Sequence, residues 1–64
     1  MDTTEEDIID HYRFGWELSE DSKEFPKWFK SDKLKQACLL GYMDWDLGVV
    51  KENTEILKEI NAGT

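Results

Sequence analysis

The chain has 64 residues, a net charge of −7 and a single cysteine, so it forms at most one small domain, residues 1–64, and no intrachain disulfide. Because His11 is the only histidine, a Cys/His zinc site is excluded as well. No apolar run approaches the roughly 20 residues that a membrane span needs, so an integral membrane protein is not expected.

The N-terminal sequence MDTTEEDIID opens with acids, whereas a signal peptide opens with a basic and then an apolar segment. A single unpaired thiol is typical of a reducing compartment. The chain begins at Met1 without a visible tag, and we expect a complete short gene product. These features predict a cytoplasmic protein.

Charge is distributed unevenly along the sequence. Residues 1–21 carry eight acids and one arginine, residues 22–36 carry five lysines and two acids, and residues 37–64 carry five acids and two lysines. The three segments therefore have net charges of −7, +3 and −3. Because nucleic-acid binding depends on clustered cations, direct binding to nucleic acid is disfavoured outside the basic middle segment.

The first predicted helix covers about residues 4–18. Thr3 or Thr4 can cap its N-terminus, and an acid three residues further on completes a capping box. Two opposite sides then follow at helical spacing, an apolar one with Ile8, Tyr12, Gly15 and Trp16 and a polar one with Glu6, Asp10, Arg13 and Glu17.

A linker is predicted after this helix, because the sequence SEDSKE is polar and Pro26 blocks a helix that arrives from before it. The sequence PKWF can form a single helical turn that starts at Pro26, which is a favoured first-turn position for proline. Such a turn would press Trp28 and Phe29 onto the helices.

A second helix is predicted over about residues 32–47, capped by Ser31. Gly48 either ends it in a left-handed cap or is absorbed into one long helix at a cost of roughly 1 kcal/mol, and we favour the break. A third helix is expected over about residues 50–61, with Val50 at the start of its apolar side. No segment alternates as a strand does. The predicted fold is all-α, a small helical hairpin with a Pro/aromatic linker and a C-terminal helix.

Each of the two longer helices carries a glycine followed by an aromatic residue, Gly15-Trp16 in the first and Gly41-Tyr42 in the second. A glycine in the middle of a helix is destabilising unless the missing side chain lets another helix come close. The pair predicts two helices that cross at their glycines, with the aromatics beside the contact. Two unrelated glycines are the alternative.

The chain thus combines a helix carrying Gly15-Trp16, a polar linker Ser22-Lys23-Glu24 shortly before Pro26, and a second helix with Gly41-Tyr42 followed by Trp45. This combination resembles the ribosome modulation factor family and its phage and plasmid relatives over about residues 8–48. The family's Cys-Pro-aromatic turn reads FPKW here, without the cysteine, and the linker is shorter. The resemblance implies two helices joined by an ordered loop. It also implies ribosome binding. The ribosome-bound members of the family are strongly basic RNA-binding proteins, whereas this chain has a net charge of −7.

The acids of the first helix indicate a basic partner. Carboxylates one helical turn apart lie about 5 to 6 Å from each other, close to the spacing of successive phosphates. Such a surface can imitate a nucleic-acid backbone and bind where nucleic acid normally binds. It predicts a phage or mobile-element inhibitor that blocks the basic nucleic-acid-binding surface of a host protein in the cytoplasm of the bacterial host cell. An anti-CRISPR protein or an inhibitor of a polymerase or nuclease would be of this type. The alternative is a solvated helix face. The candidate partner-binding residues are Glu5, Glu6, Asp10, Glu17, Asp44 and Asp46.

The basic middle segment supports an alternative, a ribosome-associated factor that contacts RNA by stacking aromatic rings on bases and pairing lysines with phosphates. The candidate residues for it are Lys23, Lys27, Lys30, Lys33, Lys35 and Trp28. The same segment could instead form the lid of a small core. A third possibility is a structural homodimer whose interface is marked by exposed tryptophans.

Residues suited to catalysis do not form a set in this sequence. His11 follows Asp10 directly, but adjacent helical residues point about 100° apart and do not form a catalytic pair. Cys38 lies on an apolar helix face without a nearby cation to lower its pKa. No phosphate-binding loop, metal cluster or nucleophile elbow is found. We expect a protein that is not an enzyme and needs no cofactor or metal.

Overall fold

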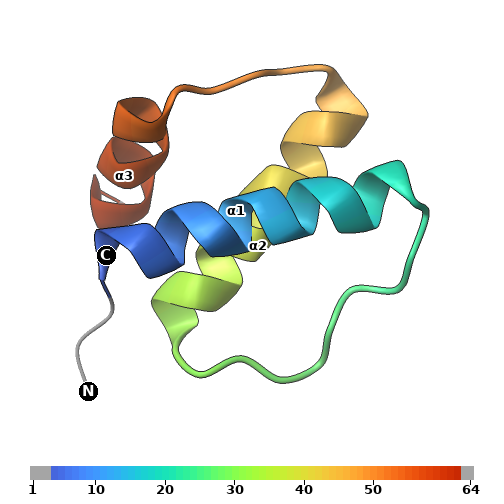
Figure 1. Cartoon of the computed structure of the whole chain (residues 1–64), viewed down its shortest axis with the longest axis horizontal. Helices are drawn as coiled ribbons and strands as arrows, with labels where there is room; N and C mark the ends of the chain where they lie inside the picture. Colours follow the sequence, from blue (N-terminus) through green and yellow to red (C-terminus); the bar gives the residue numbers. More distant parts are fainter. Residues whose placement is uncertain (1–3, 63–64) are drawn as a thin grey trace.

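The computed structural model describes residues 4–62, which form three helices: α1 (Glu5–Glu20), α2 (Asp32–Leu47) and α3 (Asn53–Ala62). Helices α1 and α2 cross and pack against each other, and the shorter α3 lies beside the first half of α1 (Figure 1). No strand is present in residues 4–62, so the all-α prediction is confirmed. None of the three helices is long and apolar enough to cross a membrane.

Both predicted N-caps of the hairpin are present. The Thr4 side chain accepts a hydrogen bond of 3.1 Å from the Asp7 amide, and the Ser31 side chain accepts one of 3.3 Å from the Leu34 amide. Each cap satisfies an amide that has no partner within its helix. Thr3, the alternative cap for α1, lies outside the described residues. The acids that follow Thr4 suit the positive end of the helix dipole.

The C-termini of α1 and α2 end in the same capping conformation. After α2, Gly48 adopts a left-handed conformation with φ 72°, and the Val49 amide donates to the Asp44 carbonyl at 2.9 Å. After α1, Ser22 has φ 56°, and the Lys23 amide donates to the Leu18 carbonyl at 2.8 Å. Both ends are Schellman motifs. The predicted break at Gly48 is therefore confirmed, whereas α1 continues two residues beyond the predicted end.

Two local predictions are wrong. The sequence PKWF forms no helical turn, and Trp28 is 78% exposed, whereas Phe29 is half-buried and lies against His11 of α1 as expected. Helix α3 begins at Asn53, three residues later than predicted, and Val50 is 82% exposed. The left-handed cap turns the chain away from α2, and Lys51 reaches back to Asp44, so residues 49–52 connect the two helices without helical structure.

Helices α1 and α2 cross at their glycines, as predicted. A Cβ atom on Gly15 would collide with the main-chain carbonyl of Cys38, and one on Gly41 would collide with that of Tyr12. The two backbones are therefore in direct contact. Of the two predicted aromatics, Trp16 packs edge-on against Trp45 with ring centroids 5.3 Å apart, whereas Tyr42 packs edge-on against Phe25 of the loop.

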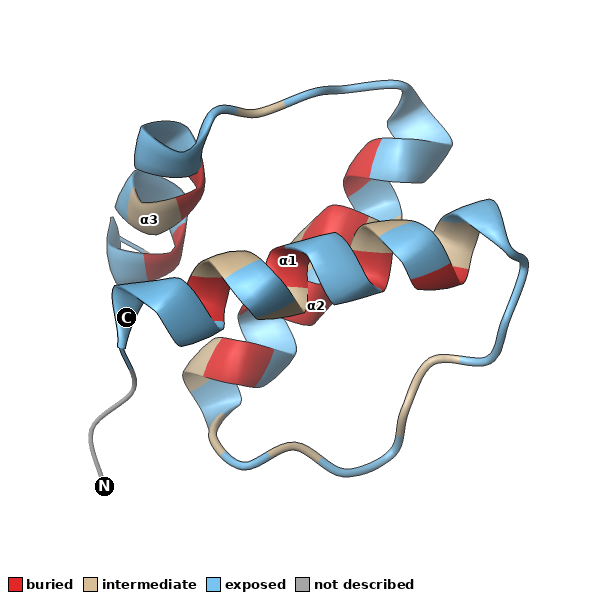
Figure 2. Ribbon diagram, viewed as in Figure 1, coloured by how far each residue is buried: buried red, intermediate tan, exposed pale blue. Residues whose placement is uncertain are grey.

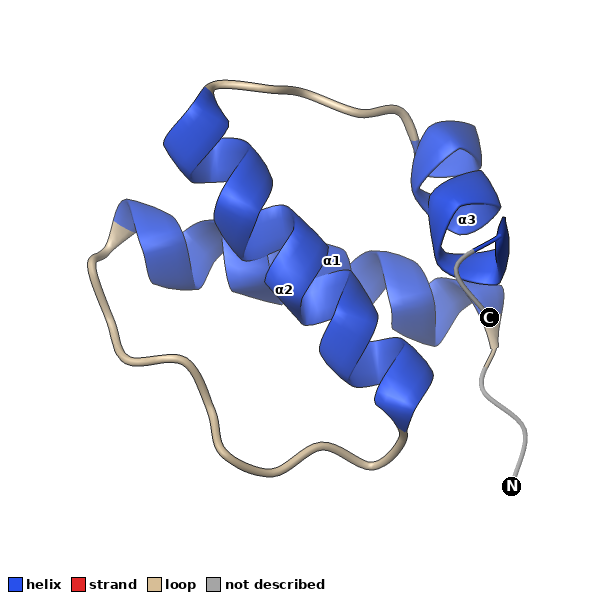
Figure 3. Ribbon diagram, turned by 180° about the vertical axis from the view of Figure 1, so that it is seen from behind, coloured by secondary structure: helices blue, strands red, loops and turns tan. Residues whose placement is uncertain are grey.

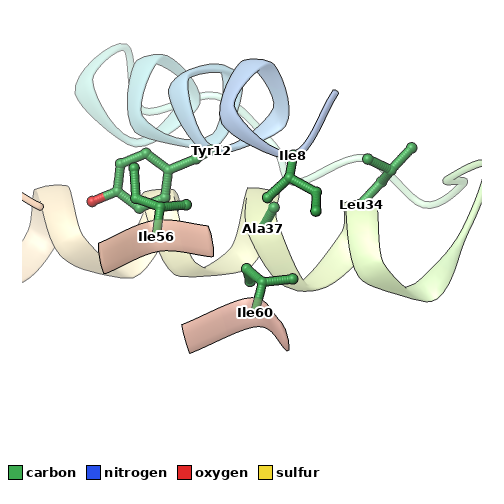
Figure 4. Packing of buried hydrophobic residues seen from close by; sticks show 6 residues of the cluster. All are labelled: Ile8, Tyr12, Leu34, Ala37, Ile56 and Ile60. Carbon is green, nitrogen blue, oxygen red and sulfur yellow. The ribbon is translucent and has the colours of Figure 1, made fainter. Parts of the chain in front are cut away.

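The core lies where the three helices meet. Side chains from each helix point into the same space (Figure 4), and the buried residues line the inner sides of the helices (Figure 2). Helix α3 contributes two buried residues to this cluster, Ile56 and Ile60. The cluster consists of Ile8, Tyr12, Leu34, Ala37, Ile56 and Ile60.

Candidate functional site

The side of α1 that faces away from α2 is strongly acidic. Helix α1 buries Ile8, Tyr12 and Gly15 against its neighbours, and the polar residues on the opposite side are exposed (Figure 2). From Glu6 to Asp21 this side is about 22 Å long at 1.5 Å per residue. We call it the outer face of α1, and it consists of Glu6, Asp10, Arg13, Glu17, Glu20 and Asp21.

The carboxylates of this face form no ion pair within residues 4–62. The ion pairs between residues 4–62 join Lys51 to Asp44 and Lys51 to Glu59, and neither involves α1. Of the four predicted site residues on α1, Glu6, Asp10 and Glu17 are brought together on the outer face. Glu5 is exposed in the first turn, but helical spacing puts it in line with the half-buried Ile9, to one side.

Asp44 does not belong to any acidic surface, which corrects the prediction that it binds a partner. It is 3% exposed and accepts hydrogen bonds from the Tyr12 hydroxyl and from Lys51 Nζ, the latter at 2.8 and 3.0 Å. A buried carboxylate whose oxygens are hydrogen-bonded within the fold is not accessible to another protein. Asp46 is exposed, but on the side of α2 that faces away from α1, so it is separated from the outer face of α1.

Tyr12, Asp44 and Lys51 form a polar cluster that the sequence did not predict. It joins α1, α2 and the segment before α3, and Lys51 also lies 3.5 Å from Glu59 on α3. Burial, and then the hydrogen bond to Asp44, raises the pKa of Tyr12 far above its usual value. The hydrogen bond to Asp44 also raises the pKa of Lys51. Through these hydrogen bonds and ion pairs, the cluster connects all three helices.

The candidate residues of the basic segment lie in the loop between α1 and α2 and at the start of α2. Four of the five lysines are exposed, whereas Lys33 is half-buried and donates a hydrogen bond of 3.0 Å to Asn61. Trp28 projects from the loop, but Phe25 and Phe29 pack against each other and are half-buried. The exposed lysines are Lys23, Lys27, Lys30 and Lys35.

The three tryptophans occupy two separate places. Trp16 and Trp45 pack against each other beside the glycine crossing, and Trp28 lies in the loop. Exposed aliphatic side chains gather elsewhere, on α2. Two of them, Leu39 and Met43, border a groove of about 470 Å³ between α2 and α3, which is also lined by Gln36, Leu40, Glu59, Ile60 and Ala62.

The two residues considered for catalysis are engaged in the fold. His11 Nδ1 donates a hydrogen bond of 2.8 Å to the Asp7 carbonyl one turn earlier. Cys38 is buried beneath Gly15, and burial raises the pKa of its thiol to about 11, so the thiol stays protonated at neutral pH. Within residues 4–62, no group of three His, Cys, Asp or Glu side chains comes together as metal ligands would.

Comparison with protein families, with curated proteins and with solved structures gives no match to this chain. The resemblance to the ribosome modulation factor family therefore rests on the residues of the hairpin alone. What the geometry offers is an acidic helix face on one side of the molecule and a basic, aromatic loop between α1 and α2.

Proposed function

We propose that this protein is a small inhibitor that places the outer face of α1 in the basic, nucleic-acid-binding groove of another protein. One observation carries the proposal. Five carboxylates and one guanidinium line a helix face about 22 Å long, and no ion pair within the described residues neutralises any of these carboxylates.

The spacing of these charges suits a groove that normally holds nucleic acid. Cβ atoms one helical turn apart lie about 5 to 6 Å from each other, and this face has acids at that spacing on both sides of Arg13, namely Glu6 with Asp10 and Glu17 with Glu20. Lysines or arginines that contact neighbouring phosphates could contact these acids instead. The contact at Gly15 fixes α1 on α2, and the face is therefore ordered before binding, which lowers the entropic cost. The net charge of −7 would steer the chain towards a basic partner.

The partner class that fits is a host protein that handles nucleic acid, such as an immune effector, a nuclease or a polymerase. A small gene product of a phage or mobile element would use the acidic face to keep such a protein from its nucleic acid. The exposed positions of Glu6, Asp10 and Glu17 make them the central contacts of the proposal.

A charge-reversal experiment tests this function. The tagged chain is used to capture partners from a bacterial lysate, and captured proteins are then challenged with double-stranded DNA. We expect the chain to capture a nucleic-acid-binding protein, and we expect added DNA to displace that protein from the chain. The variant Glu6→Lys/Asp10→Lys/Glu17→Lys should no longer capture this protein, while far-UV circular dichroism shows unchanged helicity.

A matched control separates the outer face from net charge. Glu24, Glu52 and Glu55 are exposed and lie outside α1, so Glu24→Lys/Glu52→Lys/Glu55→Lys changes the net charge by the same amount. This control should retain the partner. The proposal would be contradicted if the wild type, the outer-face variant and the control variant captured the partner equally. It would also be contradicted if both variants lost the partner to the same extent.

A second candidate function is favoured by Trp28, a residue that is 78% exposed between Lys27 and Lys30 in the loop. An exposed aromatic ring flanked by cations can stack on a base and pair with phosphates, as in a ribosome-associated factor. Sedimentation with ribosomes distinguishes the two candidates. The second predicts comigration that moderate salt abolishes and that Trp28→Ala weakens, whereas the first predicts none.

A further inference from the structure

Helix α2 is apolar on two sides, although only one of them is packed. Leu34, Ala37 and Gly41 face the core. On the opposite side Leu39 is 39% exposed, Met43 50% and Leu47 68%. Seen from behind, α2 lies in front of α1, and no other helix of residues 4–62 lies over it (Figure 3). An exposed apolar side of a helix is a surface that often packs against another protein.

The exposed side of α2 continues into a concave surface. The groove of about 470 Å³ between α2 and α3 begins at Leu39 and Met43 and extends to Ile60 and Ala62. Its lining is mainly apolar and includes the half-buried Leu40. The apolar surface is therefore contiguous across two helices and hollowed enough to receive side chains from another protein.

Two charges flank this surface in a self-complementary arrangement. Lys35 and Asp46 lie about three helical turns apart on one side of α2, with Leu39 and Met43 between them. Both are exposed, and neither forms an ion pair within the described residues. In an antiparallel pair of α2 helices around a two-fold axis, Lys35 of each chain lies beside Asp46 of the other. A parallel pair would place like charges together instead.

We propose that this side of α2 is the interface of an antiparallel homodimer. In the dimer, Leu39 of one protomer packs against Met43 of its partner, and the two Lys35–Asp46 pairs close the ends. The same patch is used on both subunits, as a two-fold interface requires. We call it the α2 interface face, and it consists of Lys35, Leu39, Leu40, Met43, Asp46 and Leu47.

The net charge of the chain does not prevent this pairing. The interface face carries one cation and one anion, while the largest acidic surface is the outer face of α1 on the far side of each protomer. The dimer would therefore display two acidic faces pointing away from each other. The inference does not depend on the proposed function, because it rests on a different helix face and has its own test. Since a single helix face is small, we expect a weak dimer, with dissociation in the micromolar range.

The first test is the oligomeric state of the full chain as a function of concentration. Sedimentation equilibrium from the low micromolar to the millimolar range should show a reversible monomer–dimer equilibrium. Met43→Lys should give a monomer throughout. Val50→Lys is the matched control, because Val50 is 82% exposed but lies outside α2, and this variant should dimerise like the wild type.

The second test is a charge swap that reports the antiparallel arrangement. Lys35→Asp and Asp46→Lys each place like charges across the interface and should raise the dissociation constant several-fold. The double variant Lys35→Asp/Asp46→Lys exchanges the two charges and should return it towards the wild-type value. Circular dichroism checks that each variant remains helical, which is expected because both positions are exposed.

Three results would overturn the homodimer. One is a wild-type chain that stays monomeric at millimolar concentration. Another is a Val50→Lys variant that dissociates as fully as Met43→Lys. The third is a double charge swap no tighter than the single variants. If the chain is monomeric and Met43→Lys loses a captured protein partner, the face belongs to that partner and not to a second copy.

Discussion

Gly15 of α1 lies directly against the main-chain carbonyl of Cys38 on α2, without space for even a methyl group between the two backbones. Gly41 stands in the same relationship to the carbonyl of Tyr12. The position of α1 on α2 is therefore fixed by contact between main chains and not by interlocking side chains alone.

Replacing either glycine by alanine should destabilise the protein. Helix propensity alone predicts the opposite, because alanine is better than glycine in a helix by about 1 kcal/mol. The collision with a backbone carbonyl cannot be relieved by a rotamer change. Gly15→Ala and Gly41→Ala should therefore each lower the free energy of unfolding by about 1–3 kcal/mol or more. Thermal denaturation followed by circular dichroism measures this. A midpoint equal to or above that of the wild type would disprove the close contact.

Ser22 and Gly48 occupy equivalent left-handed positions at the ends of α1 and α2, with opposite expected effects on mutation. Ser22→Gly removes the strain of a left-handed serine and should stabilise the fold. The gain should be about 1 kcal/mol or less, because glycine also increases the conformational entropy of the unfolded chain. Gly48→Ala should destabilise it by about 1 kcal/mol, and purely through the backbone, since no atom beyond the two neighbouring residues lies within 4 Å of the added Cβ. Urea unfolding of the two variants tests both signs.

The buried cluster around Asp44 predicts an unequal response to the loss of its two partners. Lys51→Met leaves a buried carboxylate without a counter-charge and should cost about 3–5 kcal/mol. Tyr12→Phe removes one hydrogen bond but keeps the ion pair, and about 1–3 kcal/mol is expected. Glu59→Gln is the control, because Glu59 is half-exposed at 3.5 Å from Lys51 and should contribute about 0–1 kcal/mol. Equal urea midpoints for Lys51→Met and Glu59→Gln would argue against this role of Asp44.

Stability should fall at alkaline pH. Burial raises the pKa of Cys38 from its usual 9.0 to about 11, and the pKa values of Tyr12 and Lys51 are raised as well. Each group binds its proton more tightly when folded, so its contribution is complete below the unfolded-state pKa and is lost as the pH rises through the folded-state value. The loss should begin near pH 9 with Cys38 and continue above pH 10 with Tyr12 and Lys51.

Urea unfolding at a series of pH values between 7 and 11 measures this dependence. Tyr12→Phe should be less stable than the wild type at neutral pH but should lose less of its remaining stability above pH 10, since one of the titrating groups is gone. A wild-type stability that is constant up to pH 11 would show that these groups are not protected in the folded state.

The sequence predicted what local chemistry determines. Thr4 and Ser31 are caps with a short-range mechanism, and a glycine inside a helix has few explanations other than a close crossing. The exposed acids of α1 were predicted for the same reason, because helical spacing alone separates Glu6 and Asp10 from the buried side.

The errors concern positions that long-range contacts decide. Asp44 was expected on a surface because carboxylates usually are, and only the approach of Tyr12, thirty-two residues away in the chain, makes its burial possible. A signal was nevertheless present, since Asp44 continues the stripe of Ala37 and Gly41 that faces α1. The late start of α3 follows from Lys51 turning back to Asp44, which apolar periodicity does not reveal.

The attachment of α3 has a further consequence for how the molecule opens. Only Ile56 and Ile60 of this helix are buried, and the segment that leads into it is held by Lys51. Such a short, lightly anchored element is the natural unit for local unfolding, so amide hydrogens of α3 should exchange with solvent sooner than those near the glycine crossing. Each opening would uncover Ile8 and Tyr12 while the α1–α2 hairpin stays formed. The lifetime of this small protein in the presence of proteases would then depend on the docking of its last helix.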